Sequence, residues 1–240
     1  MNGKSTGWIL IPEPALSCSA VDTDQQRLQM LADIESGVEL TRDLIGRDHL
    51  SQRVMTAMRE VPREAFVPEN MRHAAFRDGA LPVGHGQTIS QPYIVALMTD
   101  LLELGQDSSV LEIGTGTGYQ AAILSRLARQ VYSIERIPAL AQAARQRLLE
   151  MGYDNVETRC GDGYQGWPEK APFDGIIVTA AAPFIPPALL NQLKPGGRMV
   201  IPIGMPYSHQ QLKLVTRDEN GEIGTRSLIG VAFVPLVDAD

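Results

Sequence analysis

Cysteine is scarce in this sequence, and its scarcity excludes several kinds of protein. Only Cys18 and Cys160 occur among 240 residues, so the chain has no disulfide framework of the kind that stabilises small secreted domains. This usage is typical of a reducing compartment, and we expect a cytoplasmic protein. The four histidines are scattered and form no group with metal-ligand spacing, so we expect no metal site.

Long hydrophobic runs and an excess of positive charge are absent as well. The apolar stretch 175–190 is interrupted by Pro183, Pro186 and Pro187, and the short run 8–11 is followed by further prolines. We therefore expect no membrane-spanning segment and no signal peptide. The net charge of −7 argues against a general electrostatic attraction to nucleic acid. What remains is an ordinary globular composition, long enough for one α/β domain.

Residues 110–119, with the sequence Val-Leu-Glu-Ile-Gly-Thr-Gly-Thr-Gly-Tyr, predict a buried strand, a glycine turn and the start of a helix. Gly114, Gly116 and Gly118 alternate with threonines, and their missing side chains allow a ligand to approach the backbone. The helix that follows offers free N–H groups. A second strand, 131–134, is followed by Glu135, and an acid in that place can accept hydrogen bonds from both hydroxyls of a ribose.

The spacing of the glycines distinguishes between nucleotide ligands. The dinucleotide fingerprint is G-x-G-x-x-G, whereas this chain has G-x-G-x-G with Glu112 just before it. A carboxylate beside the loop disfavours a diphosphate, but it suits the ammonium and sulfonium groups of S-adenosylmethionine (AdoMet). We therefore expect AdoMet rather than NAD. A glycine turn that binds nothing stays open as the alternative.

The pattern of the remaining chain predicts one domain with an extension. Residues 1–24 are expected to form a loose N-terminal extension, and 25–240 a single domain made of a helical prelude (25–84), a cofactor-binding core (85–204) and C-terminal strands (205–240). Ser51 is a candidate N-cap within the prelude. Strand and helix patterns alternate over 108–204, which predicts a doubly wound, mostly parallel sheet with its ligand above the strand carboxyl ends. The tail pattern places final strands at 212–216 and 231–237, joined through a turn at Asn220 and Gly221.

Two polar segments have more than one interpretation. Residues 84–92 read as a polar loop before a helix that starts near Pro92, so Thr88 and Ser90 could cap that helix or bind an anion. Asp162 lies between two glycines after a third predicted strand. It could receive the amino group of an adenine, or it could belong to an ordinary Asp-Gly turn.

Over residues 27–238 the sequence resembles the protein-L-isoaspartate (D-aspartate) O-methyltransferase family, bacterial type. The resemblance rests on Val-Pro-Arg-Glu-Ala-Phe-Val-Pro at 61–68, Gly-Gln-Thr-Ile-Ser-Gln-Pro at 86–92, the glycine loop at 111–118, and the segments 161–163, 179–183 and 233–236. It implies a Rossmann-like AdoMet-dependent methyltransferase fold with swapped last strands and an N-terminal helical extension. It also implies methylation of the free carboxylate of L-isoaspartyl and D-aspartyl residues in damaged proteins, which starts repair through a succinimide.

The resemblance also implies roles for individual residues. Ser90 matches the active-site serine, and Val234 and Pro235 match a segment that lies against the substrate backbone. We assign the following residues to cofactor binding: Thr88, Ile89, Glu112, Gly114, Gly116, Gly118, Glu135, Arg136, Asp162 and Gly163. The expected partners are isoaspartyl-containing proteins and peptides, without nucleic acid or membrane, and the enzyme is expected to be a monomer.

Other functions fit the sequence less well. The Asn-Pro-Pro-Tyr-like motif of methyltransferases that act on amino groups is absent after the fourth strand, where residues 179–183 read Thr-Ala-Ala-Ala-Pro. A protein that only binds others has no need of Glu112, Glu135 and Asp162 together. An NAD-dependent oxidoreductase is disfavoured by the glycine spacing.

Overall fold

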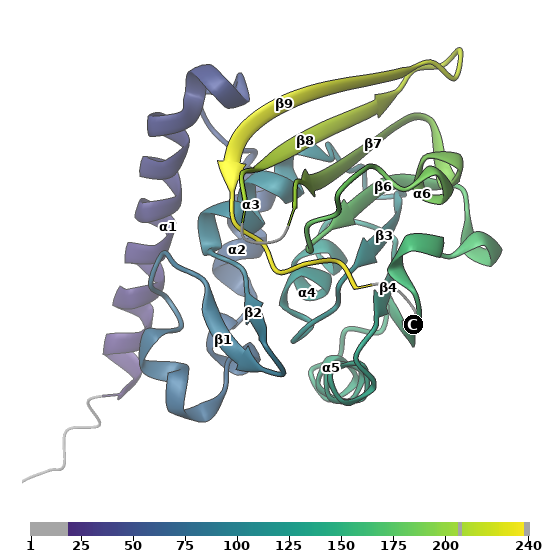
Figure 1. The fold of residues 1–240 in the computed structure, drawn as a ribbon. Helices are drawn as coiled ribbons and strands as arrows, with labels where there is room; N and C mark the ends of the chain where they lie inside the picture. Colours follow the sequence, from purple (N-terminus) through teal and green to yellow (C-terminus); the bar gives the residue numbers. More distant parts are fainter. Residues whose placement is uncertain (1–18, 206–207, 238–240) are drawn as a thin grey trace, which may run out of the picture.

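The fold is α/β, with a seven-stranded sheet covered by helices and a separate two-stranded hairpin (Figure 1). The computed structural model describes residues 19–205 and 208–237, except for the side chains of residues 19–22. The α-helices are α1 (Ser19–Ile45), α2 (Gln52–Glu60), α3 (Pro92–Leu101), α4 (Tyr119–Ser125), α5 (Pro138–Glu150) and α6 (Pro187–Gln192). Short 3₁₀ helices are η1 (Arg63–Phe66), η2 (Glu69–Ala74), η3 (Gly163–Gln165) and η4 (Pro168–Lys170). The strands are β1 (Leu81–Gly84), β2 (Gln87–Ile89), β3 (Ser109–Ile113), β4 (Gln130–Glu135), β5 (Val156–Cys160), β6 (Phe173–Val178), β7 (Leu193–Ile203), β8 (Gln210–Arg217) and β9 (Ile223–Val231).

The large sheet has the strand order β5-β4-β3-β6-β7-β8-β9. Strands β3 to β7 are parallel, and β8 is antiparallel to both of its neighbours. The doubly wound, mostly parallel sheet is therefore confirmed, and its last two strands follow chain order at one edge. Chain order reverses at β3, which lies between β4 and β6. The carboxyl ends of β3, β4, β5 and β6 consequently meet at one edge, where such sheets bind their ligands.

Two apolar cores lie on opposite faces of this sheet. Consecutive strand residues alternate between them, because side chains of a strand point to opposite faces. Val110 joins the core shared with α1 to α4, whereas Leu111 joins the core shared with α6. Ile177 and Ile176 divide in the same way. Burial on both faces holds the central strands in place, so the positions from which the loops at their ends start are fixed.

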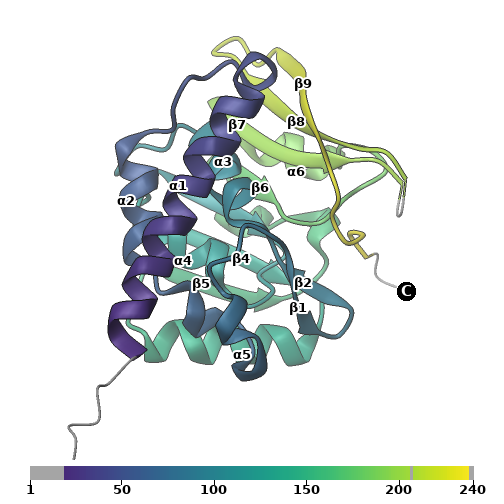
Figure 2. The ribbon, with the colours of Figure 1, turned by 90° about the vertical axis from the view of Figure 1, so that its left-hand side faces the viewer.

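Helix α1 begins earlier than the sequence pattern indicated. It starts at Ser19, so residues 19–24, which were predicted to be part of the loose extension, are helical. The sequence has no proline or glycine between residues 19 and 36, so no helix-breaking residue separates 19–24 from the predicted helical region. The buried residues Met30, Ile34 and Val38 fix its inner face. Figure 2 shows α1 crossing in front of α2 and α3. Residues 1–18 of the predicted extension lie outside the described part of the chain.

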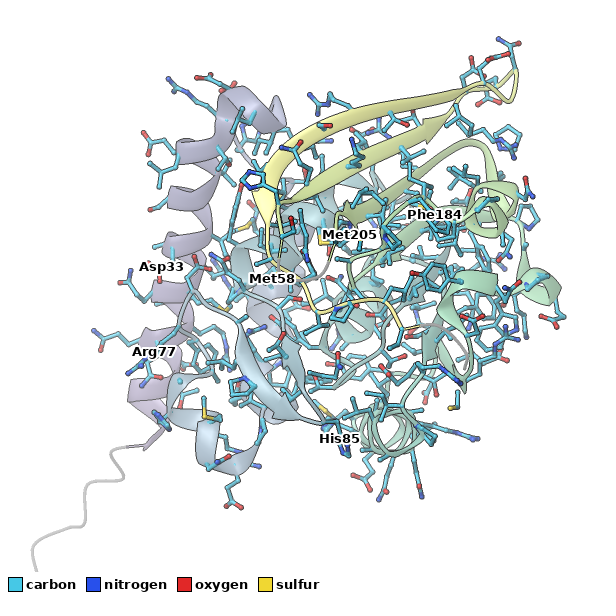
Figure 3. The ribbon with its side chains drawn as sticks, viewed as in Figure 1. Asp33, Met58, Arg77, His85, Phe184 and Met205 are labelled. Atoms are coloured by element: carbon cyan, nitrogen blue, oxygen red, sulfur yellow. The ribbon has the colours of Figure 1, made fainter. Side chains whose placement is uncertain are left out.

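The polar segment before α3 is a hairpin rather than the loop that the sequence predicted. Strands β1 and β2 pair antiparallel through a turn in which Gly84, His85 and Gly86 all have positive φ angles. Such short strands carry too little alternation to be recognised from sequence. Figure 3 shows His85 at the tip of this hairpin, close to α5. Helix α3 is preceded by Gln91 as its N-cap, whose side chain makes no capping bond, and the carboxylate of Asp78 instead accepts the N–H of Tyr93 in the first turn. The capping interpretation of Thr88 and Ser90 is therefore wrong, whereas Ser51 does cap α2.

The C-terminal region differs from the prediction in one respect. The last strand is β9, which ends at Val231, so the predicted strand 231–237 lies mostly beyond it. Residues 232–237 instead form an extended segment, which we call the strap. It crosses the carboxyl ends of the parallel strands toward the C-terminus (Figure 1). The strap pairs with Ala181 through two backbone hydrogen bonds of 2.8 Å, from Ala181 to Val234 and from Leu236 to Ala181.

Candidate active site

The glycine loop after β3 turns through three left-handed residues, as the sequence predicted. Gly114, Gly116 and Gly118 have φ angles of 97°, 54° and 91°, which a residue with a side chain adopts only at a cost. A Cβ atom on Gly114 would lie 2.4 Å from Oγ1 of Thr179, so this glycine is required for packing. A Cβ atom on Gly116 would meet nothing within 4 Å. The middle of the loop therefore faces open space, where a ligand can approach the backbone.

Glu135, at the end of β4, is fixed against this loop. One carboxylate oxygen accepts the N–H of Gly116 at 2.8 Å, and the other accepts the N–H of Ile137 at 2.9 Å. The side chain is buried and therefore held in one orientation. A carboxylate has about four acceptor positions, so two remain for hydroxyl donors. This geometry fits the ribose-binding role that the sequence predicted.

Glu112 lies behind the loop instead of lining the cleft. It is fully buried and accepts a short hydrogen bond from the hydroxyl of Ser133, its partner in the parallel pairing of β3 and β4. The pKa of its carboxyl is raised to about 8, mainly by burial and also by the nearby charge of Glu135, although the Ser133 hydrogen bond opposes this rise. With these neighbours Glu112 keeps its proton at neutral pH. Its second oxygen has no hydrogen-bond partner among the described residues.

Asp162 and Gly163 follow β5 at the same edge of the sheet. The carboxylate of Asp162 accepts the N–H of Tyr164 at 2.9 Å and so caps η3. Gly163 is buried, and a Cβ atom there would lie 2.4 Å from Cγ2 of Ile113, so the close approach of this turn to β3 requires glycine. Capping uses one oxygen of Asp162, and its other oxygen remains available to a ligand.

A cleft joins these loops at the carboxyl ends of β3, β4, β5 and β6. It contains eight of the residues that we selected from the sequence, and they are Thr88, Gly114, Gly116, Glu135, Arg136, Gly163, Val234 and Pro235. The hairpin forms one wall, and the strap forms another. Glu112, Gly118 and Asp162 are not among the residues that line it. Ile89 packs in the core beside α3, so only its backbone could reach a cofactor.

A second cavity, of about 510 Å³, adjoins the cleft and contains Ser90. Thr88 lines both spaces, so they adjoin at strand β2. The strap is divided between the two spaces, because Phe233 faces this cavity whereas Val234 and Pro235 face the cleft. The two strap residues predicted to contact the substrate therefore line the cleft and not the cavity that contains Ser90.

Sequence reasoning missed three residues that shape these spaces. Thr179 donates to the carbonyls of Ile113 and Gly114 and lines the cleft. Gln210 binds both the N–H and the carbonyl of Phe233, at 2.6 and 3.0 Å, and so fixes the start of the strap. Arg63 donates to the carbonyl of Ser90 at 2.7 Å. Thr179 and Arg63 belong to segments that the resemblance used, but no local pattern marks the long-range bonds of Arg63 and Gln210.

Residues 19–205 and 208–237 contain no group of three or more His, Cys, Asp or Glu side chains that could hold a metal ion. No helix within the same ranges has the length and apolar character needed to cross a membrane.

Comparisons with known proteins agree on one family. Residues 37–240 match the model of the family described as protein-L-isoaspartate (D-aspartate) O-methyltransferase. A protein-L-isoaspartate O-methyltransferase 2 from Syntrophobacter fumaroxidans is 59% identical over 243 residues, which cover 98% of each chain. A protein of the same name from Polaromonas sp. is 55% identical over 207 residues, which cover 86% of this chain and 98% of the relative.

Solved structures give the same result. A protein-L-isoaspartate O-methyltransferase has a TM-score of 0.75 and 29% identity, covering 87% of this chain and 65% of the other. A protein from Plasmodium falciparum, described as a member of this family in complex with S-adenosyl-L-homocysteine (AdoHcy), has a TM-score of 0.69 and 25% identity. That match covers 85% of this chain and 97% of the other.

Proposed function

The chain belongs to the protein-L-isoaspartate (D-aspartate) O-methyltransferase family, and we propose that its two adjoining cavities share the reaction between them. The enzyme transfers a methyl group from AdoMet to the free carboxylate of L-isoaspartyl and D-aspartyl residues in damaged proteins. The ester then closes to a succinimide, which begins repair. The cleft at the strand ends is the cofactor site in this proposal, and the cavity around Ser90 receives the damaged residue.

In the cofactor site, each residue has a task that its geometry supports. Gly116 lets the cofactor approach the loop, and Glu135 accepts the ribose hydroxyls with its free acceptor positions. Gly163 lines the cleft and approaches the adenine, and Asp162, which is next to Gly163 but does not line the cleft, offers its second carboxylate oxygen, while Arg136 and Thr88 border the cleft. Glu112 lies behind the loop and contacts Ser133 instead of the cofactor. Gly118, in a left-handed conformation, precedes the first residue of α4. AdoMet supplies the electrophilic methyl group when it is bound.

In the substrate cavity, Ser90 orients a carboxylate. A carboxyl group with a pKa near 4 is already ionised at neutral pH, so the reaction needs no strong base. It needs one carboxylate oxygen held in line with the methyl group, with water kept out. The hydroxyl of Ser90 provides a hydrogen bond that fixes this orientation. Val234 and Pro235 cover the junction from the strap side.

The shared position of Thr88 is the observation on which this proposal depends. Because Thr88 lines both spaces and Ser90 comes two residues later, the cleft and the cavity meet at the end of β2. This arrangement supports our proposal that Ser90 holds the substrate carboxylate beside the cofactor cleft. We further propose that the enzyme acts as a monomer in the cytoplasm, since one chain supplies the lining of both spaces and the exposed thiol of Cys160 suits a reducing compartment.

Replacing Ser90 by alanine tests the division of roles. We expect Ser90→Ala to lower kcat about 100-fold, as the loss of one oriented hydrogen-bond donor does in other active sites. The affinity for AdoHcy, measured by calorimetry, should stay within about twofold of the wild-type value. Ser36→Ala, which removes an exposed hydroxyl on α1, is the matched control. Loss of AdoHcy binding in Ser90→Ala, or unchanged turnover, would contradict the proposed role of Ser90.

A further inference from the structure

Arg63, in η1, is fully buried and connects two parts of the active site. Its Nε atom donates to the carbonyl of Ala75 at 2.8 Å, and Nη2 donates to the carbonyl of Ser90 at 2.7 Å. The guanidinium carbon lies 4.8 Å from the centre of the Tyr119 ring. Tyr119 is the first residue of α4, the helix that follows the glycine loop. One side chain therefore contacts both the Ser90 turn and the helix that begins at the cofactor loop.

Asp78 attracts the charge of Arg63 without forming an ion pair with it. No ion pair joins it to any residue in the described ranges, and its Nη1 atom is buried there without a hydrogen-bond partner. Burial lowers the pKa of its guanidinium, and the nearby Tyr119 and Asp78 both act to raise that pKa. Taking a cation out of water costs stability, and in return Arg63 meets two carbonyls and an aromatic ring. Because these contacts join Ser90 to the helix after the glycine loop, a role beyond stability can be tested for this arginine.

A second side chain also fixes the turn that Arg63 holds. One carboxylate oxygen of Asp78 accepts the side-chain amide of Gln91 at 2.7 Å, and the other accepts the N–H of Tyr93 at 3.2 Å. Arg63 thus binds Ser90, and Asp78 binds two of the residues that follow it. Because Ser90 lies outside any helix or strand, such contacts decide where its hydroxyl points.

We propose that Arg63 is a positioning residue for methyl transfer, which acts by holding the backbone of Ser90 in a fixed place relative to the cofactor loop. This inference rests on the proposed role of Ser90. Displacing a reacting group by about 1 Å can cost about 100-fold in rate. The loss of the Arg63 contacts therefore lowers kcat, while the cofactor cleft, which Arg63 does not line, keeps its affinity.

A double-mutant cycle tests the proposal on the full-length enzyme. The variants are Arg63→Gln, Ser90→Ala and their combination, with Arg63→Lys as the conservative replacement. Arg53→Gln is the matched control, because Arg53 also donates to two backbone carbonyls, those of Leu104 and Leu127, on another part of the surface. The measured quantities are kcat and KM for an isoaspartyl peptide, the Kd for AdoHcy and the melting temperature.

We expect Arg63→Gln to lower kcat about 30-fold with KM for the peptide and Kd for AdoHcy within about threefold, and Arg63→Lys to recover part of the loss. The double variant should be about as slow as Ser90→Ala alone, because both changes disable the same hydroxyl. Arg53→Gln should keep the wild-type kcat.

If Arg63→Gln turns over normally while Ser90→Ala is slow, the inference fails and the role of Ser90 stands. If Ser90→Ala turns over normally, the proposed function of Ser90 itself fails. Losses that multiply in the double variant, or a loss of AdoHcy binding in Arg63→Gln, would also overturn the inference.

Discussion

Glu135 accepts a hydrogen bond of 2.8 Å from the backbone N–H of Gly116. This contact joins the end of β4 to the glycine loop at the end of β3, and the second oxygen of the carboxylate is held by Ile137. The acid that should bind the ribose is thus part of the structure of the loop that should receive the rest of the cofactor. Both elements are therefore already oriented by the fold.

Replacing Glu135 by glutamine should weaken cofactor binding. Glutamine keeps one acceptor oxygen for a backbone N–H, but its NH2 group is a donor that faces the other backbone N–H, and the charge is lost. Hydrogen bonds to charged groups are worth about 1.5–3 kcal/mol, so we expect the Kd for AdoHcy to rise about 10- to 100-fold in calorimetry. Glu150→Gln, on the exposed side of α5, serves as the control. An unchanged Kd in Glu135→Gln would show that the ribose binds elsewhere.

Adding a methyl group to Gly116 tests whether the cofactor passes over the loop. Gly116 and Gly152 both have positive φ angles, and a Cβ atom on either would meet nothing within 4 Å. Alanine at either position should therefore lower the free energy of unfolding by a similar amount, about 1–2 kcal/mol. Only Gly116→Ala should raise the Kd for AdoHcy, by at least about 10-fold. Equal affinities in the two variants would place the ligand away from the loop.

The raised pKa of Glu112 predicts a pH-dependent stability. A glutamate in an unfolded chain has a pKa of about 4.3, and that of Glu112 in the folded protein is about 8. Between these values the folded state binds more protons than the unfolded state, so this group's contribution falls by up to about 1.4 kcal/mol per pH unit as the pH rises. Glu112→Gln removes this titration. Urea titrations give the free energies of unfolding of Glu112→Gln and of the wild type. The value for Glu112→Gln minus the value for the wild type should increase from pH 5 to pH 8. A constant difference would refute the raised pKa of Glu112.

The contact between Gln210 and Phe233 should control the strap. In Gln210→Ala the strap loses both hydrogen bonds that fix its start, although the pairing with Ala181 remains. We expect faster hydrogen exchange at the amide of Leu236, which donates to Ala181, and an affinity for AdoHcy about 10-fold lower. Asn155→Ala is a control, because Asn155 also binds two backbone atoms, the carbonyls of Ser125 and Ala128, outside both cavities. Unchanged exchange at Leu236 would mean that Ala181 alone holds the strap.

The sequence predicted those features that depend on neighbouring residues. Gly114, Gly116 and Gly118 are adjacent to a strong apolar strand pattern, and Glu135 ends the next strand, so the loop and the acid could be placed together. Whether a side chain faces the ligand or the protein interior was harder to predict. Glu112 was expected beside the ligand but lies behind the loop against Ser133, and the side chain of Ile89 packs in the core.

Features that depend on contacts distant in sequence could not be predicted. The β1–β2 hairpin has only short strands, one of which contains Pro82, and its pairing depends on a turn of three left-handed residues. Arg63 binds a carbonyl 27 residues away, and Gln210 binds one 23 residues away. No periodicity or spacing indicates such bonds, because they arise only when the sheet brings the segments together.

Transfer of tritiated methyl groups from AdoMet tests the central claim most directly. The enzyme and its Ser90→Ala variant are each given an isoaspartyl peptide and the twin peptide with normal aspartate. The account predicts that the wild type labels the isoaspartyl peptide and leaves its twin unlabelled, and that Ser90→Ala labels the isoaspartyl peptide about 100-fold more slowly while still binding AdoHcy. Equal labelling of the two peptides, or full activity without the Ser90 hydroxyl, would contradict it.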